Sequence, residues 1–279
     1  MARKTSEGDS DLDHRAEVQE IPLLTWGLLR QVFTVETIMT PRRDLLTGEQ
    51  GTDLASVWAE ARRRRFDLLP ITRNGRIVEV LLVEDGEREP LTDRWLVSRD
   101  TAIPDLLQIL LESGRPGFFV FQRQEVVGLF TPADLNKLPV RVYLYFLIGE
   151  VELALTLQIR SHFAAKPEEA LQMLSAKRRG ELEEQIAGLT EQNIGVDPVQ
   201  LLRLSDVINI AAKHGPLRSR LGFSSRRAVE NALGGLNDLR NRTMHPVRPL
   251  LTRIPEDLER LRRYGQQAGE ILRRLEVDG

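Results

Sequence analysis

The hydrophobic and polar positions follow different patterns in the two halves of the chain. Before Pro139, short apolar runs such as residues 68–71 alternate with segments whose apolar residues recur every three or four positions, as at Leu54, Val57 and Trp58. This alternation predicts short strands mixed with helices. After Pro139 the strand pattern ends, and helical spacing continues toward the C-terminus. For 279 residues we therefore expect two domains, an α/β one and an all-α one, and an α+β fold class overall.

The first half contains an internal repeat. Residues 52–85 lie over residues 101–134 without a gap when the chain is shifted by 49 positions (101 − 52). The helical spacing of the first copy meets that of the second, and the apolar run at 68–71 meets residues 117–120. Each copy has the pattern helix, strand, turn, strand, helix, which predicts a duplicated α/β unit.

Two short stretches of this half resemble the CBS family. Residues 35–42 (Val-Glu-Thr-Ile-Met-Thr-Pro-Arg) resemble the entry to a first CBS repeat. Residues 128–134 (Gly-Leu-Phe-Thr-Pro-Ala-Asp) resemble the element that ends a CBS repeat. The resemblance implies a tandem CBS module at residues 21–138, with repeats at about 33–86 and 92–138.

The CBS resemblance implies an adenine nucleotide as regulatory ligand. In that family a carboxylate accepts hydrogen bonds from the ribose hydroxyls and a threonine lies near the phosphate, which assigns these roles to Asp134 and Thr131. Gly128, Thr101 and Phe118 complete the nucleotide site that we expect. The alternative is that Thr131 only caps a helix, with Asp134 in its first turn.

The first repeat departs from the CBS pattern. Glu79 stands where the second repeat has glycine, Leu82 stands where it has threonine, and only Asp85 is kept. A leucine side chain offers no hydrogen bond to phosphate, and a nearby carboxylate repels it. We therefore expect at most one nucleotide site per chain, in the second repeat.

The second half predicts a bundle of about five antiparallel helices over residues 139–279. The apolar spacing and the candidate caps place helices at about 143–163, 168–176, 180–190, 201–213, 226–244 and 256–272.

The helix that begins near residue 226 ends in three residues whose side chains are suited to catalysis, Arg240, Asn241 and His245. Pro246 follows, and a residue before proline is pushed out of the helical region, so His245 ends this helix. Arginine carries a fixed charge and a fork of donors suited to phosphate, and histidine exchanges protons near neutral pH. Five positions turn about 140° on an ideal helix, so one helix does not place both side chains on one phosphate.

This spacing resembles the Arg-polar-x-x-x-His motif of the HEPN family of helical ribonuclease domains. The resemblance implies a metal-independent site that two protomers of a homodimer share. Arg240 would bind the scissile phosphate, His245 would act as general base or acid, and Asn241 would orient them. Attack by the RNA 2′-hydroxyl would leave a 2′,3′-cyclic phosphate. Arg242 and Arg248 are candidate contacts to the RNA backbone.

Composition narrows the possible chemistry. The chain has no cysteine, which excludes disulfides, thiol catalysis and cysteine-ligated zinc. Its four histidines show no metal-ligand spacing, so we expect no metal site. A net charge of −2 gives no global attraction to nucleic acid.

Residues 1–20 are polar and predict a disordered tail, not a signal peptide or anchor. The longest apolar run, residues 142–148, is far shorter than the ~20 residues of a spanning helix, so we expect a soluble cytoplasmic protein without membrane contact.

Three functional hypotheses follow. The first is an endoribonuclease, as in defence systems, whose HEPN-like bundle is gated by a CBS module that senses AMP, ATP or an oligoadenylate. The second is a non-catalytic sensor whose bundle binds RNA or a protein partner. The third is a CBS accessory protein of ion transport, because residues 38–44 also resemble transporter-associated CBS modules. The absence of a predicted spanning segment and the Arg240–His245 motif argue against the third.

Overall fold

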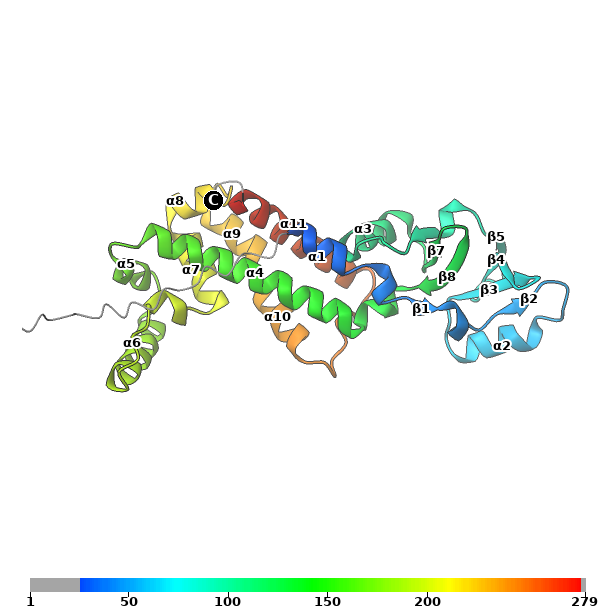
Figure 1. Ribbon diagram of the computed structural model, residues 1–279, viewed down its shortest axis with the longest axis horizontal. Coiled ribbons are helices and arrows are strands. Elements are labelled where there is room, and N and C mark those ends of the chain that lie inside the picture. The colour runs from blue at the N-terminus through cyan, green and yellow to red at the C-terminus, as the bar shows by residue number, and fades with distance from the viewer. Residues whose placement is uncertain (1–25, 277–279) are drawn as a thin grey trace, which may run out of the picture.

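The computed structural model describes residues 26–276, and the tail expected at residues 1–20 lies outside this range. The molecule is elongated, with two small sheets at one end and helices at the other (Figure 1). Two long helices, α4 (Leu138–His162) and α11 (Glu256–Glu276), extend from the helical end toward the sheets. The predicted α+β class, with an N-terminal α/β part and a helical C-terminal part, is confirmed.

The two repeats fold alike. The first contains β1 (Thr40–Pro41), β2 (Gly48–Glu49), α2 (Ala55–Arg63), β3 (Leu68–Arg73) and β4 (Arg76–Leu82). The second contains β5 (Arg88–Pro90), β6 (Leu96–Ser98), α3 (Ile103–Ser113), β7 (Phe118–Gln122) and β8 (Glu125–Phe130). The shift of 49 positions therefore lays each element of the first repeat over its counterpart in the second.

Sheet pairing also repeats. One sheet has the order β2-β3-β4-β5 and the other has the order β1-β8-β7-β6. The first strand of each repeat therefore joins the sheet of the other repeat, because β1 pairs with β8 and β5 pairs with β4. The β3–β4 register shifts between Ile71 and Thr72, and the β7–β8 register shifts between Val120 and Phe121. These two irregularities are also 49 positions apart (120 − 71). Such a bulge bends a strand locally, and its recurrence confirms the duplication.

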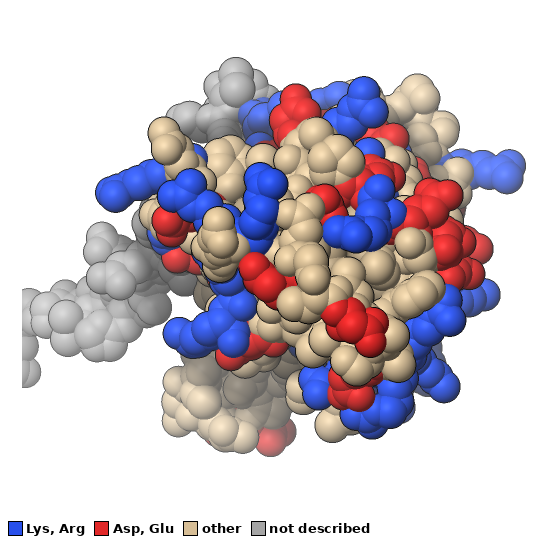
Figure 2. Space-filling view, turned by 90° about the vertical axis from the view of Figure 1, so that its right-hand side faces the viewer, with Lys and Arg blue, Asp and Glu red and all other residues tan. Residues whose placement is uncertain are grey.

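Short helices connect and flank these strands. They are α1 (Trp26–Val32) and the 3-10 turns η1 (Val35–Thr37), η2 (Arg42–Asp44), η3 (Asp93–Trp95) and η4 (Pro132–Asn136). The end of the molecule that the first repeat forms presents acidic and basic side chains intermixed, without a patch of one sign on that face (Figure 2).

Eight α-helices make up the described part of the second half, where we expected about five. Besides α4 and α11 they are α5 (Pro167–Gln172), α6 (Ala176–Glu191), α7 (Leu204–Lys213), α8 (Gly215–Arg220), α9 (Arg226–Leu233) and α10 (Leu236–Met244), with a 3-10 turn η5 (Pro198–Leu201). The Ser225 hydroxyl accepts a hydrogen bond from the Ala228 N–H and caps α9, as its sequence position indicated.

The prediction of one continuous helix from residue 226 to the Arg240 motif was wrong. The chain breaks it at Gly234 and Gly235, between α9 and α10. A Cβ atom at Gly235 would lie 1.6 Å from the Tyr264 hydroxyl oxygen of α11, so only glycine leaves room for this tyrosine. A residue far along the sequence therefore packs directly against the break.

One hydrophobic core joins the second repeat to the helical half. Ile103 and Phe118 of the repeat belong to the same buried cluster as Leu144 of α4 and Leu261 of α11. Helix α4 begins at Leu138, directly after η4, so no linker separates the two halves. The first repeat has smaller clusters of its own. The second repeat is thus fixed to the bundle, and the first repeat lies outward of it (Figure 1).

Within the described residues, one helix, α4, is long and apolar enough to cross a membrane by length and composition alone. Half of its most apolar stretch is buried inside the structure, and it packs against α7, α10 and α11. The core helix of a helical bundle has the same composition, because it is apolar on most sides.

Candidate functional site

A cavity of 1160 Å³ lies between the two repeats and the bundle. Several pairs of its lining residues occupy equivalent positions in the two repeats. These pairs are Arg65 with Gly114, Phe66 with Arg115, Asp67 with Pro116, Val83 with Pro132 and Glu84 with Ala133. The helical half contributes Ile254, Pro255 and Leu258 to the wall. Both repeats and the start of α11 therefore face one common space, which we call the central cavity.

Three arginines place positive charge on the central cavity. The Arg62 guanidinium donates to the backbone oxygens of Val83 and Glu84, at 3.3 and 3.2 Å. The Arg115 guanidinium lies 4.0 Å from the ring centroid of Trp95, which holds it by a cation–π contact. Arg65 is exposed at the rim. Fixed guanidinium groups of this kind suit the oxygens of a phosphate.

Carboxylates also line the central cavity. Burial raises the pKa of the Asp67 carboxyl, and the neighbouring Glu84 raises it further. With Asp85, three carboxylates stand against three arginines around the central cavity.

Thr131 and Asp134 lie beside the central cavity, where Pro132 and Ala133 between them form part of its wall. Asp134 is 6% exposed. Its carboxylate accepts hydrogen bonds from the Thr131 N–H at 2.7 Å and the Thr131 hydroxyl at 3.3 Å. It also pairs with the Lys137 ammonium at 2.7 Å. The capping arrangement weighed as the alternative is therefore present, and a ribose would have to exchange partners with this carboxylate.

Gly128, Thr101 and Phe118 have structural contacts as well. A Cβ atom at Gly128 would lie 2.8 Å from the Thr40 backbone oxygen, so glycine allows β1 to pair with β8. The Thr101 backbone oxygen accepts from the Val35 N–H at 2.9 Å. Phe118 is buried in the large core cluster. Their part in nucleotide binding stays a prediction.

Glu79 and Leu82, the two residues of the first repeat that differ from the CBS pattern, contact other parts of the protein. The Glu79 carboxylate accepts from the Gln50 amide at 2.9 Å and forms an ion pair with Arg88. Leu82 packs on the cluster of apolar side chains between the two sheets. Leu82 also lines the central cavity, and the single site expected in the second repeat stays a prediction.

The Arg240 motif lies at the C-terminal end of α10. The helix ends at Met244 and His245 is its C-cap, with φ −106° and ψ 86°, as Pro246 indicated. Arg240 is half-buried, and Asn241 and His245 are exposed. Among residues 26–276, no hydrogen bond or ion pair engages the side chains of Arg240, Asn241 or His245. These side chains are therefore open to a ligand.

A residue that sequence reasoning missed holds the end of this helix. Arg141 of α4 is 4% exposed. Its Nη1 donates to the backbone oxygens of Arg242 at 2.9 Å, Thr243 at 3.4 Å and His245 at 3.2 Å, and its Nη2 donates to the Arg248 oxygen. Burial lowers the pKa of this guanidinium. A cation at a helix C-terminus satisfies the last carbonyls and the helix dipole. The signal available in the sequence was an arginine surrounded by apolar residues, at positions 140–144.

Arg242 and Arg248 differ in their surroundings. The Arg242 Nη2 donates to the Leu250 oxygen at 2.6 Å, and Nη1 lies 3.7 Å from the Asp257 carboxylate. This side chain therefore points into the protein, whereas Arg248 is exposed. Asp257 is 2% exposed, and burial alone would raise its pKa. Hydrogen bonds from the N–H groups of Thr252 and Arg253, the Thr252 hydroxyl and the charge of Arg242 outweigh burial and lower the pKa to about 2.

One loop connects the Arg240 motif to the central cavity. Residues 245–255 run from the C-cap of α10 to Ile254 and Pro255 in the cavity wall. Midway, the Leu251 N–H donates to the Asn136 side-chain oxygen at 2.9 Å, and Asn136 also lines the cavity. We call these residues the connecting loop. The chain of the connecting loop and the hydrogen bond between Leu251 and Asn136 therefore join the cavity wall to the Arg240 motif.

No family model and no curated protein matches the chain. Several solved structures are similar to its N-terminal part. The CBS domain of the bacterial CNNM/CorC family Mg²⁺ transporter in complex with ATP is 23% identical, covers 39% of this chain and 87% of that chain, and has a TM-score of 0.33. CBSX2 in complex with AMP is 16% identical over 39% of this chain and 98% of that chain, with a TM-score of 0.34. A CBS-domain pair with bound AMP from Klebsiella pneumoniae is 17% identical over 37% of this chain and 94% of that chain, with a TM-score of 0.31.

Proposed function

We propose that the two repeats bind an adenine nucleotide in the central cavity and that the helical half carries the response. The observation that carries this proposal is the lining of the cavity by equivalent positions of both repeats together with Ile254, Pro255 and Leu258. Small-molecule sites occupy about 300–1,000 Å³, so a cavity of 1160 Å³ has room for a nucleotide. Arg62, Arg65 and Arg115 supply charge for phosphates.

The adenine moiety is proposed from the resemblance of residues 128–134 to a CBS element. Thr131 and Asp134 lie at the cavity edge, where the resemblance assigns them to phosphate and ribose. Asp134 would release its contacts with Lys137 and Thr40, 2.7 and 3.5 Å away, to accept ribose hydroxyls. The Lys137 ammonium, which also donates to the Ile38 backbone oxygen at 2.6 Å, would then have a donor left for a phosphate.

The response reaches the helical half through the connecting loop. A nucleotide that contacts Ile254 or Pro255 stabilises the position of the connecting loop in which these contacts form. The other end of the connecting loop is His245, whose backbone oxygen accepts a hydrogen bond from Arg141. A nucleotide regulates the motif only to the extent that it binds two loop positions with different affinity.

Calorimetric titration with AMP and ATP tests the binding. Ala133 is exposed at the cavity wall, so Ala133→Trp fills the space without disturbing the core. The expected result is one site per chain in the wild type and a loss of at least tenfold in affinity in Ala133→Trp. Ala187→Trp on α6 is the matched control, since it adds the same exposed side chain away from the cavity. A wild type that binds neither AMP nor ATP would contradict the proposal.

We infer that the response is RNA cleavage by Arg240, Asn241 and His245 from two protomers. The neutral imidazole of one His245 accepts the proton of the ribose 2′-hydroxyl, whose oxygen attacks phosphorus. The protonated imidazole of the second copy gives its proton to the departing 5′-oxygen, and Arg240 stabilises the charge on the phosphoryl oxygens. The products are a 2′,3′-cyclic phosphate and a 5′-hydroxyl. The exposed Asn241 and His245 beside the half-buried Arg240 at the end of α10 support this proposal.

A second candidate function is binding of RNA or protein by the helical half without cleavage. It is favoured by the inward direction of Arg242, whose contacts with Leu250 and Asp257 leave fewer free cations beside the motif. Labelled RNA with wild type and His245→Ala, with and without AMP, ATP and oligoadenylate, separates the two. A cyclic-phosphate product that His245→Ala does not form supports cleavage, whereas binding without product supports the second candidate.

A further inference from the structure

One side of the core helix α4 is both apolar and exposed. Its residues recur every three or four positions, so they lie along a single side of the helix. Leu138 is 66% exposed and Tyr145 is 49% exposed, although both are large apolar side chains on the central helix of the bundle. We use the name α4 face for the seven residues on this side, which are Leu138, Val142, Tyr145, Phe146, Gly149, Leu153 and Leu157.

The exposed apolar side chains of the protein are concentrated around the α4 face. Among residues 27–275, eleven large apolar side chains are exposed, and six of them belong to α4 or α1. These six are Leu28, Val32, Leu138, Tyr145, Phe146 and Leu157. A single exposed apolar residue is ordinary on a protein surface, whereas a contiguous group of them marks an interaction site.

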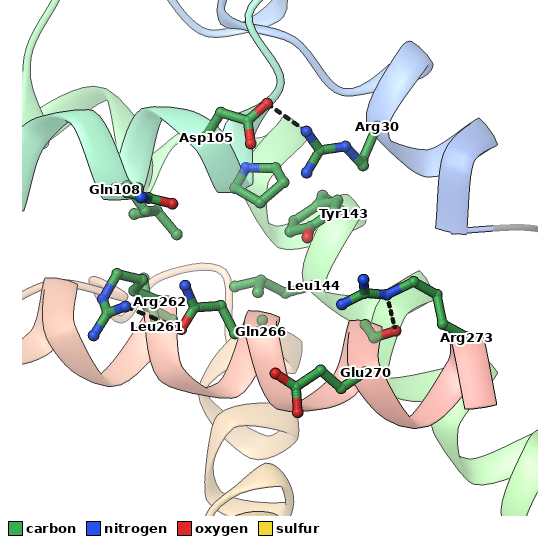
Figure 3. A pocket seen from close by; sticks show the side chains of 14 residues that line it. Arg30, Asp105, Gln108, Tyr143, Leu144, Leu261, Arg262, Gln266, Glu270 and Arg273 are labelled. Atoms are coloured by element: carbon green, nitrogen blue, oxygen red, sulfur yellow. Dashed lines mark hydrogen bonds and ion pairs between the residues drawn. The ribbon is translucent and has the colours of Figure 1, made fainter. Parts of the chain in front are cut away.

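Helix α1 borders the α4 face. The ring of Phe33, directly after α1, lies with its centroid 5.8 Å from that of Tyr143 and 6.4 Å from that of Phe146. The Arg30 guanidinium of α1 pairs with the Asp105 carboxylate of α3 at 2.5 Å, above Tyr143 in the view of Figure 3. This ion pair ties α1 to the second repeat, so the border of the α4 face is part of the fold.

The middle of the α4 face carries no charge. Residues 142–149 contain no Asp, Glu, Lys or Arg. The charged residues at the two ends of this run, Arg141 and Glu150, are buried. A helix that faces water normally has charged or polar residues on its outer side. The core of a protein–protein interface is depleted of charge, and the α4 face has this composition.

Gly149 lies in the middle of the α4 face. A Cβ atom at this position would meet nothing within 4 Å, so packing within the described chain does not require glycine here. Glycine lowers the stability of a helix interior relative to other residues. Its absent side chain lets another backbone approach closely. A second helix that crosses α4 at Gly149 would use this property.

The α4 face is complementary to itself. A twofold axis through Gly149 sets each residue against the one that lies equally far on the other side of Gly149. Tyr145 then meets Leu153 of the second copy, and Phe146 meets Glu152 of the second copy. The edge of an aromatic ring is positive, so the carboxylate of Glu152 meets no like charge. Each contact occurs twice, as a twofold interface requires.

We propose that the α4 face binds the α4 face of a second copy of this chain, with the two helices antiparallel and crossing at Gly149. From Leu138 to Leu157 the face is about 30 Å long, at 1.5 Å per residue. A stable interface of roughly 800 Å² per partner extends about as far in each direction. The choice of a second copy as the partner rests on the proposed cleavage, which needs two protomers.

This interface brings the second copy to the Arg240 side of α10. Helix α10 lies along α4 (Figure 1), and Arg242 points toward Asp257 of α11. Residues two apart on a helix point about 200° apart, so Arg240 faces away from α11. The α4 face also points away from α11, because α11 packs on the buried side of α4, where Leu144 and Leu261 share one cluster. Arg240 and the α4 face are therefore both turned from α11 toward the second copy.

Sedimentation velocity of the full chain tests this inference. The wild type is expected to sediment as a dimer. Gly149→Glu replaces a glycine inside a helix by a better helix former, so it should melt no lower than the wild type. Its buried and unpaired carboxylate is expected to weaken association at least about tenfold. Gly188→Glu in α6, where a Cβ atom also meets nothing within 4 Å, is the matched control and should stay dimeric. A monomeric wild type would overturn the proposal, and so would a Gly149→Glu variant that dimerises as the wild type does.

A single thiol locates the contact. The chain has no cysteine, so Gly149→Cys introduces one thiol per chain. Two such thiols form a disulfide only where their Cα atoms are about 4.4–6.8 Å apart. Mild oxidation is expected to convert Gly149→Cys into a covalent dimer that a reductant separates, and to leave Gly188→Cys unlinked. Absence of the covalent dimer in Gly149→Cys, or equal linking of the two variants, would contradict the crossing at Gly149.

RNA cleavage measured on the same samples separates this proposal from the proposed function. A wild type that dimerises through the α4 face and cuts no RNA would contradict the proposed cleavage and leave the interface in place. A wild type that cuts RNA as a monomer would overturn the interface.

Discussion

Arg141 donates from its guanidinium to the backbone oxygen of His245 at 3.2 Å, across 104 positions of sequence. A buried cation on the core helix α4 thus fixes the backbone of the residue that we propose as the catalytic histidine. The same guanidinium reaches three further carbonyls around the end of α10. The geometry of the motif is therefore set from the core and not by α10 alone.

Loss of Arg141 should destabilise the protein. Arg141→Met keeps the apolar stem but leaves buried carbonyls without donors, which costs about 2–4 kcal/mol of unfolding free energy. Arg141→Lys should recover only part of this, because one ammonium cannot reproduce the planar fork. Urea denaturation measures both. Arg226→Met, on an exposed pair, should change stability by less than about 1 kcal/mol, and an Arg141→Met variant as stable as this control would contradict the role given to Arg141.

Gly128 should tolerate no side chain. In Gly128→Ala the new Cβ atom would meet the Thr40 oxygen at 2.8 Å and the Met39 sulfur at 2.6 Å, so β1 must move from β8. We expect a loss of about 1–3 kcal/mol of unfolding free energy. Gly180→Ala in α6 is the matched control. Its Cβ atom meets nothing within 4 Å, and it should stabilise the helix by about 1 kcal/mol. Thermal unfolding of the two variants should show shifts of opposite sign.

Asp257 should make stability fall in acid. Its pKa is about 2 in the folded protein against an ordinary 3.8, so the folded state favours the carboxylate. This contribution is fully present above pH 3.8 and is lost as the pH falls toward 2, and it amounts to roughly 2 kcal/mol. Urea unfolding from pH 6 to pH 2.5 measures it. Asp257→Asn should flatten the curve below pH 4, and an unchanged slope in this variant would show that other carboxylates account for the acid dependence.

His214 should contribute in a different pH range. Burial lowers its pKa, and the neighbouring His162 and Arg218 lower it further. The rings of His162 and His214 lie 4.3 Å apart where α4 ends beside α8. The folded state favours the neutral imidazole, so stability is present above about pH 6.5 and declines as the pH falls below it. Thermal unfolding between pH 7.5 and pH 5 should show this decline in the wild type and less of it in His214→Gln. Equal declines would rule out His214 as its source.

Local signals in the sequence predicted much of the fold. The shift of 49 positions predicted the duplicated unit, and the structure repeats even the strand irregularities at Ile71 and Val120. Pro246 predicted the end of α10 at His245, because the restriction that proline imposes acts on its immediate neighbour. Such features need no knowledge of distant residues.

Features that depend on distant contacts were not predicted. At the break before α10, Gly235 lies against the Tyr264 hydroxyl, and the inward Arg242 side chain lies beside Asp257. A nucleotide site was expected in the second repeat alone, yet the wall of the central cavity also includes residues of the first repeat and Ile254, more than 100 positions away. Sequence spacing within one segment carries no information on these pairings.

The connecting loop is the most direct place to test the link between nucleotide and motif. Backbone amide hydrogen exchange, with and without AMP, can be followed at Arg248, Leu251 and Thr252, whose N–H groups bond to His245, Asn136 and Asp257. We predict that AMP slows exchange at these amides in the wild type and has no effect in Ala133→Trp. AMP that binds by calorimetry and leaves exchange at all three amides unchanged would contradict the account.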